Sequence, residues 1–271
     1  ASDANASDSG DLMQTTRYAL GGQSSSTSGY MGGARTSPSA TSSKIEKFPF
    51  ASDGNTTSSA DITNGGSMHQ GFSSSTDGYS YGGAQPGNAF QFKTDKFSFA
   101  SDTDSTDLGS LNTYRDPGSC QSGDKGYLLG GRSAPGPGFT QYNDIRVFAF
   151  NSDTTLSDHA DLDTARSSSS GVNSDTNGYA IGGDPQSPVA HADIQKFPFA
   201  SQTNATDVGD LSSVTSGMSS TSSTQSGYTA GGNGPGGPNI KIRKFPFASD
   251  GNSTDVGDLS TGTGYGASAQ Y

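Results

Sequence analysis

The residues best suited to chemistry are few in this chain. There are three histidines, His69, His159 and His191, and a single cysteine, Cys120. No Cys/His cluster has the spacing of zinc ligands, no Gly-rich phosphate loop precedes a helix, and no Ser/His/Asp set stands out among the many serines. We therefore predict that the protein is not an enzyme, with no catalytic residue, no cofactor and no metal ligand.

One turn carries alternating carboxylates, in the run Asp102-Thr103-Asp104-Ser105-Thr106-Asp107. Hard oxygen ligands in such a run could hold Ca²⁺. The alternative is that Asp, Asn, Ser and Thr side chains satisfy backbone groups in a turn between strands. Most related turns in the chain have only one or two carboxylates, which favours the structural interpretation.

Four triplets fit the N-glycosylation pattern and occupy equivalent places in the chain. They begin at Asn5, Asn55, Asn204 and Asn252. In a secreted eukaryotic protein these would be glycan acceptors. In a bacterial or phage product they would be Asx turns copied by duplication. With one cysteine the chain has no intrachain disulfide framework, which favours the second interpretation.

These side chains belong to a repeated unit, and a Phe-x-Phe pair sets its period. The second Phe falls at 50, 99, 150, 199 and 247, so the steps are 49, 51, 49 and 48 residues. Self-similarity at this spacing is typical of repeat architectures. Phe48 and Phe50 are two residues apart, so they share one face of a β-strand.

Each repeat has four parts, read as short strands with turns between them. A Ser/Thr/Gly-rich segment is followed by Gly-Tyr with a Gly pair, then by Ile-x-Lys-Phe-Pro-Phe, then by a polar turn leading to Gly-Asp-Leu. Four strands in about 50 residues match one blade of a β-propeller, so we predict an all-β fold. Cys120 falls on the first strand of its repeat, where we expect a buried, inert thiol.

We treat residues 1–271 as a single β-propeller domain. Five full repeats span residues 13–62, 63–111, 112–162, 163–211 and 212–259. Residues 1–12 look like an outer strand with nothing before it, and 260–271 begin a further unit. The two ends could pair in a split sixth blade that closes the ring, or the chain could be an excerpt of a longer array.

Composition limits the partners of such a fold. Only 28% of residues are hydrophobic, but 14 Phe and 11 Tyr fall mostly at repeat-fixed positions, which favours order over a flexible spacer. The net charge of -11 opposes binding to phosphate backbones and anionic lipid, so we expect no nucleic-acid partner. No stretch approaches the roughly 20 apolar residues of a membrane span, and we expect no membrane insertion.

The segment after each Gly pair varies most among the repeats. In a propeller these loops between the second and third strands emerge on one face, and variable loops on a rigid scaffold are where recognition is usually built. Unconstrained drift would look similar. The candidate recognition residues in these loops are Phe90, Arg132, Phe139, Tyr142 and His191.

The repeats resemble kelch-like propellers. Residues 126–131 look like the second strand of such a blade, and residues 144–150 look like the third. The Arg after the outer strand, at Arg17, Arg115 and Arg166, also fits. The usual outer-strand Trp is absent because the chain has no Trp, and the Leu or Ile that ends each Gly-Asp-Leu could take its place.

The unit at residues 244–259 also resembles the Phe-Pro-Phe-Ala-Ser-Asp repeats of tail-fibre or virion structural proteins of cyanophages and other aquatic phages. The resemblance implies a virion surface component: a tail fibre, a head decoration or an adhesin for host attachment. Its partners would be other virion proteins and host surface glycans, with a homo-oligomer or many copies on a particle giving avidity. The alternatives are a cellular extracellular lectin-like or matrix propeller, and a glycan-processing enzyme on a propeller scaffold.

Overall fold

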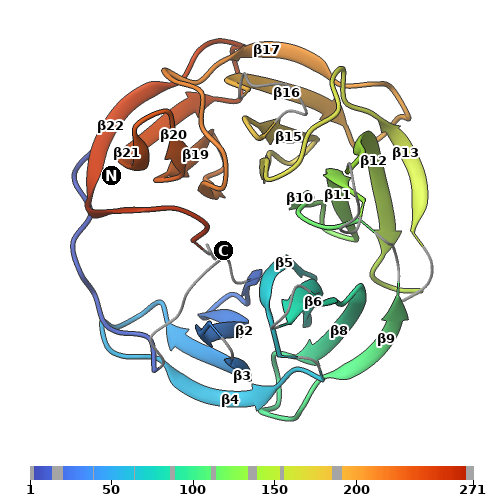
Figure 1. The fold of residues 1–271 in the computed structure, drawn as a ribbon, viewed down its shortest axis with the longest axis vertical. Coiled ribbons are helices and arrows are strands. Elements are labelled where there is room, and N and C mark those ends of the chain that lie inside the picture. Colours follow the sequence, from blue (N-terminus) through green and yellow to red (C-terminus); the bar gives the residue numbers. More distant parts are fainter. Residues whose placement is uncertain are drawn as a thin grey trace.

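A computed structural model describes residues 3–13, 21–38, 40–63, 65–85, 89–110, 114–133, 139–152, 156–184 and 191–266. It confirms the all-β prediction: the described residues form five antiparallel four-stranded blades arranged in a ring as a β-propeller (Figure 1). Each blade runs from an inner strand at the hub of the ring to an outer strand at the rim. Arg17 and Leu111 lie outside the described residues.

The strands follow the predicted order in every blade. Blade one contains β1 (Gly21–Ser24), β2 (Ser28–Ser37), β3 (Ala40–Pro49) and β4 (Thr57–Asp61). Blade two contains β5 (Ser67–Ser73), β6 (Asp77–Gln85), β8 (Lys93–Ser98) and β9 (Thr106–Ser110), with β7 (Ala89–Phe90) paired to β6. Blade three contains β10 (Gly118–Gln121), β11 (Lys125–Arg132), β12 (Gln141–Ala149) and β13 (Ser157–Asp161).

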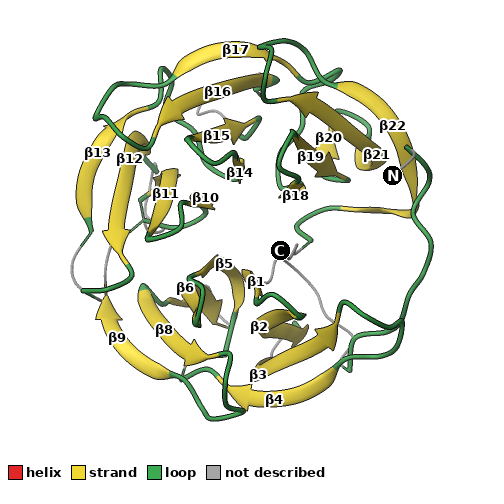
Figure 2. Cartoon of the chain, turned by 180° about the vertical axis from the view of Figure 1, so that it is seen from behind, coloured by secondary structure: helices red, strands yellow, loops and turns green. Residues whose placement is uncertain are grey.

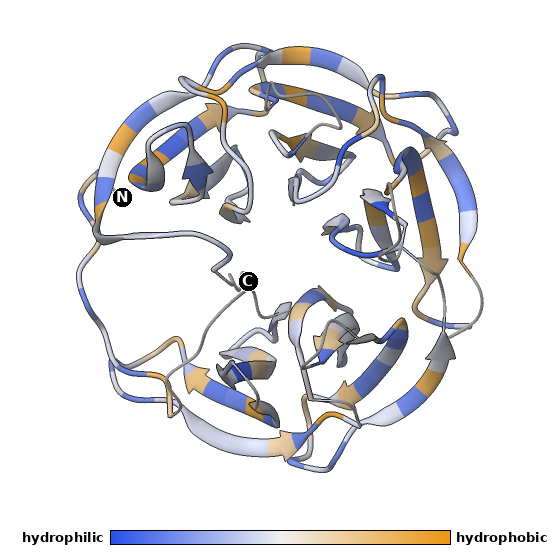
Figure 3. Cartoon of the chain, in the orientation of Figure 1, coloured by the Kyte–Doolittle hydropathy of each residue, from blue (hydrophilic) through white to orange (hydrophobic). Residues whose placement is uncertain are grey.

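Blade four contains β14 (Ser170–Asn173), β15 (Asn177–Ile181), β16 (Asp193–Pro198) and β17 (Thr206–Asp210). Blade five contains β18 (Ser219–Ser222), β19 (Ser226–Ala230), β21 (Gly237–Pro246) and β22 (Thr254–Thr263), with β20 (Asn233–Gly234) paired to β21. Hydrophobic and hydrophilic residues alternate along strands such as β12 and β16 (Figure 3). This alternation sends one side of each strand into the packing between blades.

The Phe-x-Phe motif forms the core within and between blades. Its first Phe covers the Gly of the Gly-Tyr pair in the same blade, so a Cβ on Gly178 would overlap the Phe197 ring. Its second Phe stacks on the Tyr of the preceding blade. The four stacks have centroids 4.8–4.9 Å apart and planes 18–24° apart: Tyr30–Phe99, Tyr79–Phe150, Tyr127–Phe199 and Tyr179–Phe247.

The inner strands surround the hub and approach one another closely (Figure 2). A Cβ on Gly71 would overlap the carbonyl of Gly22, and a Cβ on Gly171 would overlap the carbonyl of Ser119. Serine side chains supply further links, because Ser220 Oγ donates to the Gly171 carbonyl at 2.8 Å. Only small residues allow this spacing, which accounts for the Ser/Gly-rich composition of the first part of each repeat.

Hydrogen bonds at the rim join the outer strands β4, β13 and β17 to the turn of the next blade. The Asn252 Oδ1 accepts from the Asp210 N–H at 2.9 Å, and the Ser253 N–H donates to the Asp210 carbonyl at 2.8 Å. Asn204 and Asp161 repeat the first bond at 3.1 Å. These Asn side-chain oxygens accept hydrogen bonds from the neighbouring blade, so they link blades rather than form the expected Asx turns.

The two ends of the described chain lie in the sector between blades five and one (Figure 1). Residues 3–13 follow the rim: the Asp258 N–H donates to Asn5 Oδ1 at 3.0 Å, and the Asp11 N–H donates to Asn55 Oδ1 at 2.9 Å. Tyr265 lies at the hub, where its N–H donates to the Gly217 carbonyl at 2.7 Å. Among the described residues these ends form no sixth sheet, so the ring has five blades.

Candidate functional site

The variable loops share one face of the ring with the turns that enter the inner strands. Backbone pairing joins the two kinds of segment, between Arg115 and Arg132 in blade three, Ser167 and Asp184 in blade four, and Ser216 and Asn233 in blade five. The loops on this face are therefore anchored next to the hub.

Side chains from blades two and three gather on this face in what we call the arginine–aromatic cluster. It consists of three sets of contacts: Arg115 with Phe90, Arg132 with Phe139, and Arg146 with the Tyr114–Tyr142 pair. Backbone pairing of Arg115 with Arg132 links the first two sets, and Tyr114 precedes Arg115 in the chain. Four of the five candidate recognition residues, Phe90, Arg132, Phe139 and Tyr142, belong to it.

Two of its contacts place guanidinium groups over phenyl rings. The Arg115 guanidinium carbon lies 4.7 Å from the Phe90 ring centroid, and that of Arg132 lies 5.3 Å from the Phe139 centroid. Such cation–π contacts hold the side chains in place without enclosing them. Arg132 is also fixed by Asp116, whose Oδ2 accepts from its Nε at 2.7 Å. Phe139 keeps 36% of its surface exposed.

The other half of the cluster is a pair of stacked tyrosines. The rings of Tyr114 and Tyr142 are parallel within 9° and 3.9 Å apart, and the Arg146 guanidinium lies 5.0 Å from the Tyr114 ring. Arg146 Nη2 also donates to Asp144 Oδ2 at 2.7 Å. Partial burial and the nearby Asp144 carboxylate raise the pKa of the Tyr114 hydroxyl, so it stays protonated and can donate at neutral pH.

Fixed aromatic faces beside cations and hydroxyls suit a ligand that has both apolar faces and polar groups. The rings offer flat apolar contact, while the guanidinium groups and Tyr hydroxyls offer directed hydrogen bonds. Sugar rings and acidic sugars have this combination of surfaces.

His191 does not join the cluster. It lies in blade four, where its Nδ1 is 3.4 Å from Asp193 Oδ1. The fully buried Arg166 holds the same carboxylate, with its Nη2 2.7 Å from Asp193 Oδ2. Burial would raise the pKa of Asp193, but its hydrogen bonds to His191, Arg166 and Gln195 hold it well below the usual range. His191 thus contacts the carboxylate of the Arg166–Asp193 ion pair rather than the cluster.

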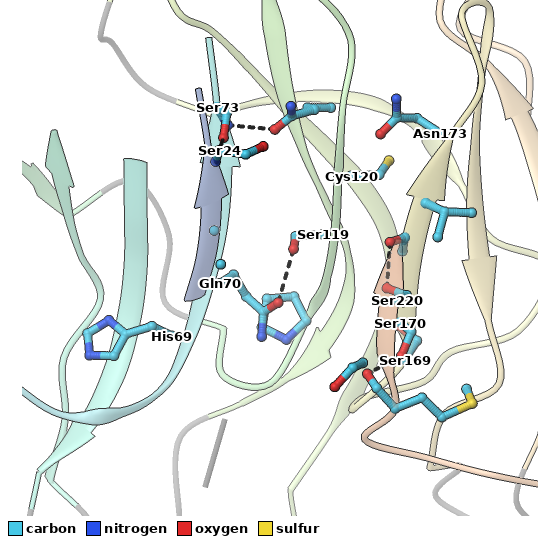
Figure 4. Close-up of a pocket in the computed structure, with 18 of the residues that line it drawn as sticks. Ser24, His69, Gln70, Ser73, Ser119, Cys120, Ser169, Ser170, Asn173 and Ser220 are labelled. Atoms are coloured by element: carbon cyan, nitrogen blue, oxygen red, sulfur yellow. Dashed lines mark hydrogen bonds between the residues drawn. The ribbon is translucent and has the colours of Figure 1, made fainter. Parts of the chain in front are cut away.

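A cavity of about 730 Å³ lies at the hub between the inner strands (Figure 4). Ser and Gly residues line most of it, and many of the serines are already bonded. Ser119 Oγ donates to Gln70 Oε1 at 3.1 Å, and the Ser24 N–H donates to Ser73 Oγ at 2.9 Å. Cys120 contributes to the wall but is itself buried, and burial raises its thiol pKa, so the thiol stays protonated.

The acidic turn at residues 102–107 forms part of the rim. Asp102 faces Lys47, Asp104 Oδ1 accepts from the Asp61 N–H at 3.0 Å, and Asp107 pairs with Lys93. Each carboxylate therefore has a separate protein partner. The described residues hold no group of three or more His, Cys, Asp or Glu side chains close enough to share a metal ion.

The centre of the cluster lies outside the predicted recognition residues. Tyr114 is not among them, and Arg115 fits the sequence pattern only as a kelch-like Arg. Both lie in the turn between the outer strand of one blade and the inner strand of the next. The adjacent Tyr-Arg pair beside the variable loops was the available signal.

Comparisons with known proteins return no relationship by sequence. No family model matches the chain, and no curated protein matches it. The described part of the chain contains no helix long and apolar enough to cross a membrane.

Proposed function

We propose that the protein is a non-enzymatic virion structural protein, a tail fibre, head decoration or adhesin, that uses its propeller to attach to host surface glycans. The observation that carries the binding role is the arginine–aromatic cluster, where blade three brings Arg132, Phe139 and Tyr142 to the face on which blade two places Phe90. The Phe-Pro-Phe-Ala-Ser-Asp repeats support the virion setting by resemblance.

The scaffold suits attachment in many copies. A single cluster of this size would bind a sugar weakly, because few contacts offset the loss of translational freedom. Copies on a particle raise the effective concentration and convert weak contacts into avidity. The other partners would be virion proteins that hold the propeller on the particle.

Glycan binding is tested by titrating the purified protein with neutral and acidic oligosaccharides by calorimetry and on an array. Arg132→Ala and Tyr142→Ala should each weaken binding at least about tenfold, as loss of one charged or stacked contact of about 1.4 kcal/mol implies. His191→Ala is the matched control in another variable loop and should bind like the parent. No binding by the parent, or equal loss in the control, contradicts the cluster as the site.

The virion setting is tested separately by immunogold electron microscopy of purified particles with antibody to this protein. Labelled tails or heads support the proposal, and particles without label contradict it. The location can fail while glycan binding persists, so the two parts are distinguishable.

A cellular lectin-like or matrix propeller is the second candidate. One observation favours it: Asn5, Asn55, Asn204 and Asn252 are all exposed, and their rim bonds use the side-chain oxygen rather than the amide nitrogen that a glycan would occupy. Mass spectrometry of the native protein decides, because occupied sites support a secreted cellular product and contradict the phage proposal.

A further inference from the structure

Two arginines face each other in the arginine–aromatic cluster, at a place where blades four and five carry neutral or acidic residues. Backbone hydrogen bonds of 2.9 Å join Arg115 and Arg132 in both directions. The same bridge in blades four and five joins Ser167 to Asp184 and Ser216 to Asn233. Like charges directly opposite each other destabilise a pair of strands. The bridge itself therefore does not require cations, and blade three departs from the repeat by carrying two.

One of these two cations is already neutralised within the protein. The Arg132 Nε donates to Asp116 Oδ2 at 2.7 Å, and its Nη2 lies 2.5 Å from the same oxygen. The third guanidinium of the cluster is paired in the same way, because Arg146 Nε and Nη2 donate to Asp144 Oδ2 at 3.1 and 2.7 Å. Both ion pairs are therefore complete without a ligand.

Arg115 has no such partner in the part of the chain that the structure describes. Its Nε donates to the Ser133 carbonyl at 3.1 Å, but neither Nη atom donates to a described residue. No described carboxylate lies within 4.0 Å of its guanidinium. The undescribed segments next to the cluster in the sequence, residues 86–88, 111–113 and 134–138, contain no Asp or Glu. Arg115 therefore carries the uncompensated positive charge of the cluster.

The surroundings of Arg115 favour an incoming anion. Partial burial and the neighbouring Arg132 lower the pKa of its guanidinium, whereas Asp116 raises it. The group stays protonated at neutral pH, so the cost of its desolvation and of repulsion by Arg132 persists. An anion on the two Nη atoms would offset both. The net charge of -11 does not prevent this, because physiological salt screens exposed charges beyond about 8 Å.

The rings beside Arg115 indicate what kind of molecule carries the anion. The Arg115 guanidinium lies over the Phe90 ring, and across the backbone bridge Arg132 lies over Phe139, which keeps 36% of its surface exposed. An oxyanion with two oxygens matches the end of a guanidinium, and the apolar face of a sugar ring matches an exposed phenyl ring. An acidic sugar has both features, whereas a neutral sugar or a free inorganic anion has only one.

We propose that the arginine–aromatic cluster selects acidic glycans, and that Arg115 is the residue that determines this specificity. A carboxylate or sulfate group of the sugar accepts hydrogen bonds from Arg115 Nη1 and Nη2, and an apolar sugar face packs on Phe139. This inference rests on the proposed glycan binding and adds the chemical class of glycan to it.

The test measures binding of the purified protein to pairs of oligosaccharides that differ only in the acidic group. The probes are uronate-, sialate- and sulfate-bearing oligosaccharides with their carboxyl-reduced or desulfated counterparts, first on an array and then by calorimetry. At least one acidic member should bind, and its neutral counterpart should bind at least about tenfold more weakly. Loss of binding on carboxyl reduction identifies a carboxylate as the group bound, and loss on desulfation identifies a sulfate.

Two substitutions separate charge from geometry at Arg115. Arg115→Gln should weaken binding of the acidic glycan at least about tenfold and leave binding of its neutral counterpart unchanged. Arg115→Lys keeps the charge but lacks the planar fork, so it should recover only part of the loss. Arg35→Gln is the matched control and should bind like the parent. It removes the same charge from the segment after the Gly pair of blade one, where Arg35 Nη2 donates to the Pro38 carbonyl.

Salt dependence gives a readout that a folding defect would not reproduce. The affinity of the parent for the acidic glycan should fall as the NaCl concentration rises from about 50 to about 500 mM, because salt screens the ion pair. Arg115→Gln should show a much smaller fall, and thermal melts should show both proteins folded.

Equal binding of the acidic and neutral members overturns the selectivity but leaves glycan binding in place. Binding of the acidic member that Arg115→Gln leaves unchanged, or that Arg35→Gln weakens equally, also overturns the role of Arg115. Absence of binding to every glycan contradicts the proposed function itself, and this inference with it. The two failures are therefore distinguishable.

Discussion

Tyr179 of blade four stacks on Phe247 of blade five, with 4.9 Å between ring centroids and 21° between planes. The two residues come from different repeats, so the contact forms only when neighbouring blades assemble. The same pairing recurs between blades one and two, between blades two and three, and between blades three and four. Because most other side chains are Ser and Gly, these rings supply much of the apolar area that holds one blade to the next.

The first prediction compares one repeat position in two blades. Tyr179→Ala should lower the free energy of unfolding by about 3–5 kcal/mol, the usual cost of removing a buried aromatic ring. Tyr228→Ala should cost less than about half of that, because Tyr228 is half-buried and no described Phe stacks on it. Urea unfolding followed by Tyr fluorescence measures both. Equal costs would mean that the stack adds little beyond packing inside one blade.

The second prediction concerns the rim. Asn252→Ala should lower the free energy of unfolding by about 1 kcal/mol, because it leaves the Asp210 N–H without its acceptor. Asn252→Asp keeps the acceptor and should change stability by less than about 0.5 kcal/mol. Blade two already uses this substitute, since Asp104 accepts from the Asp61 N–H at 3.0 Å. Thermal melts measure the stability of both variants. Equal losses of stability would contradict a stabilising role for the inter-blade hydrogen bond.

The third prediction concerns the Gly of the Gly-Tyr pair. Gly178→Ala should cost about 1–3 kcal/mol, because the new Cβ would overlap the Phe197 ring in a packed core. Gly123→Ala is the control, since no atom lies within 4 Å of a Cβ there. It should be neutral or stabilising by up to about 1 kcal/mol, through the unfolded chain. Chemical denaturation measures both, and a similar cost at the two positions would contradict the packing argument.

Much of the fold and four members of the cluster could be predicted from the sequence, but the contacts that bring the cluster together could not. The spacing of Phe48 and Phe50 and the Gly pair identified strands and their order because those features act within a few residues. The stack of Tyr79 on Phe150 spans 71 residues, so no local pattern reveals which blade receives the ring. Loop variability indicates Phe90 and Phe139 as recognition candidates, but what links them is the backbone pairing of Arg115 with Arg132, which no local pattern reveals.

The last prediction concerns acid stability and His69. This side chain is buried in β5, where its Nδ1 lies 3.2 Å from Ser80 Oγ, and burial lowers its pKa from 6.5 to about 4. In the unfolded chain the imidazole takes up a proton near pH 6.5, whereas in the folded protein it stays neutral until about pH 4. Protonation therefore favours unfolding throughout this window.

Stability from neutral His69 should be fully present above pH 6.5 and fall by about 1.4 kcal/mol per pH unit as the pH drops, to a total of about 3 kcal/mol near pH 4. His69→Gln cannot titrate, so its unfolding free energy should lack this loss. Carboxylates such as Asp193, whose pKa is lowered in the fold, contribute losses only below their unfolded pKa of 3.8 and act equally in both proteins. Urea titrations at half-unit steps from pH 7 to 4 give the difference between the two proteins. Parallel curves would show that His69 becomes protonated in the folded state without penalty, and that its site between β5 and β6 is open to water.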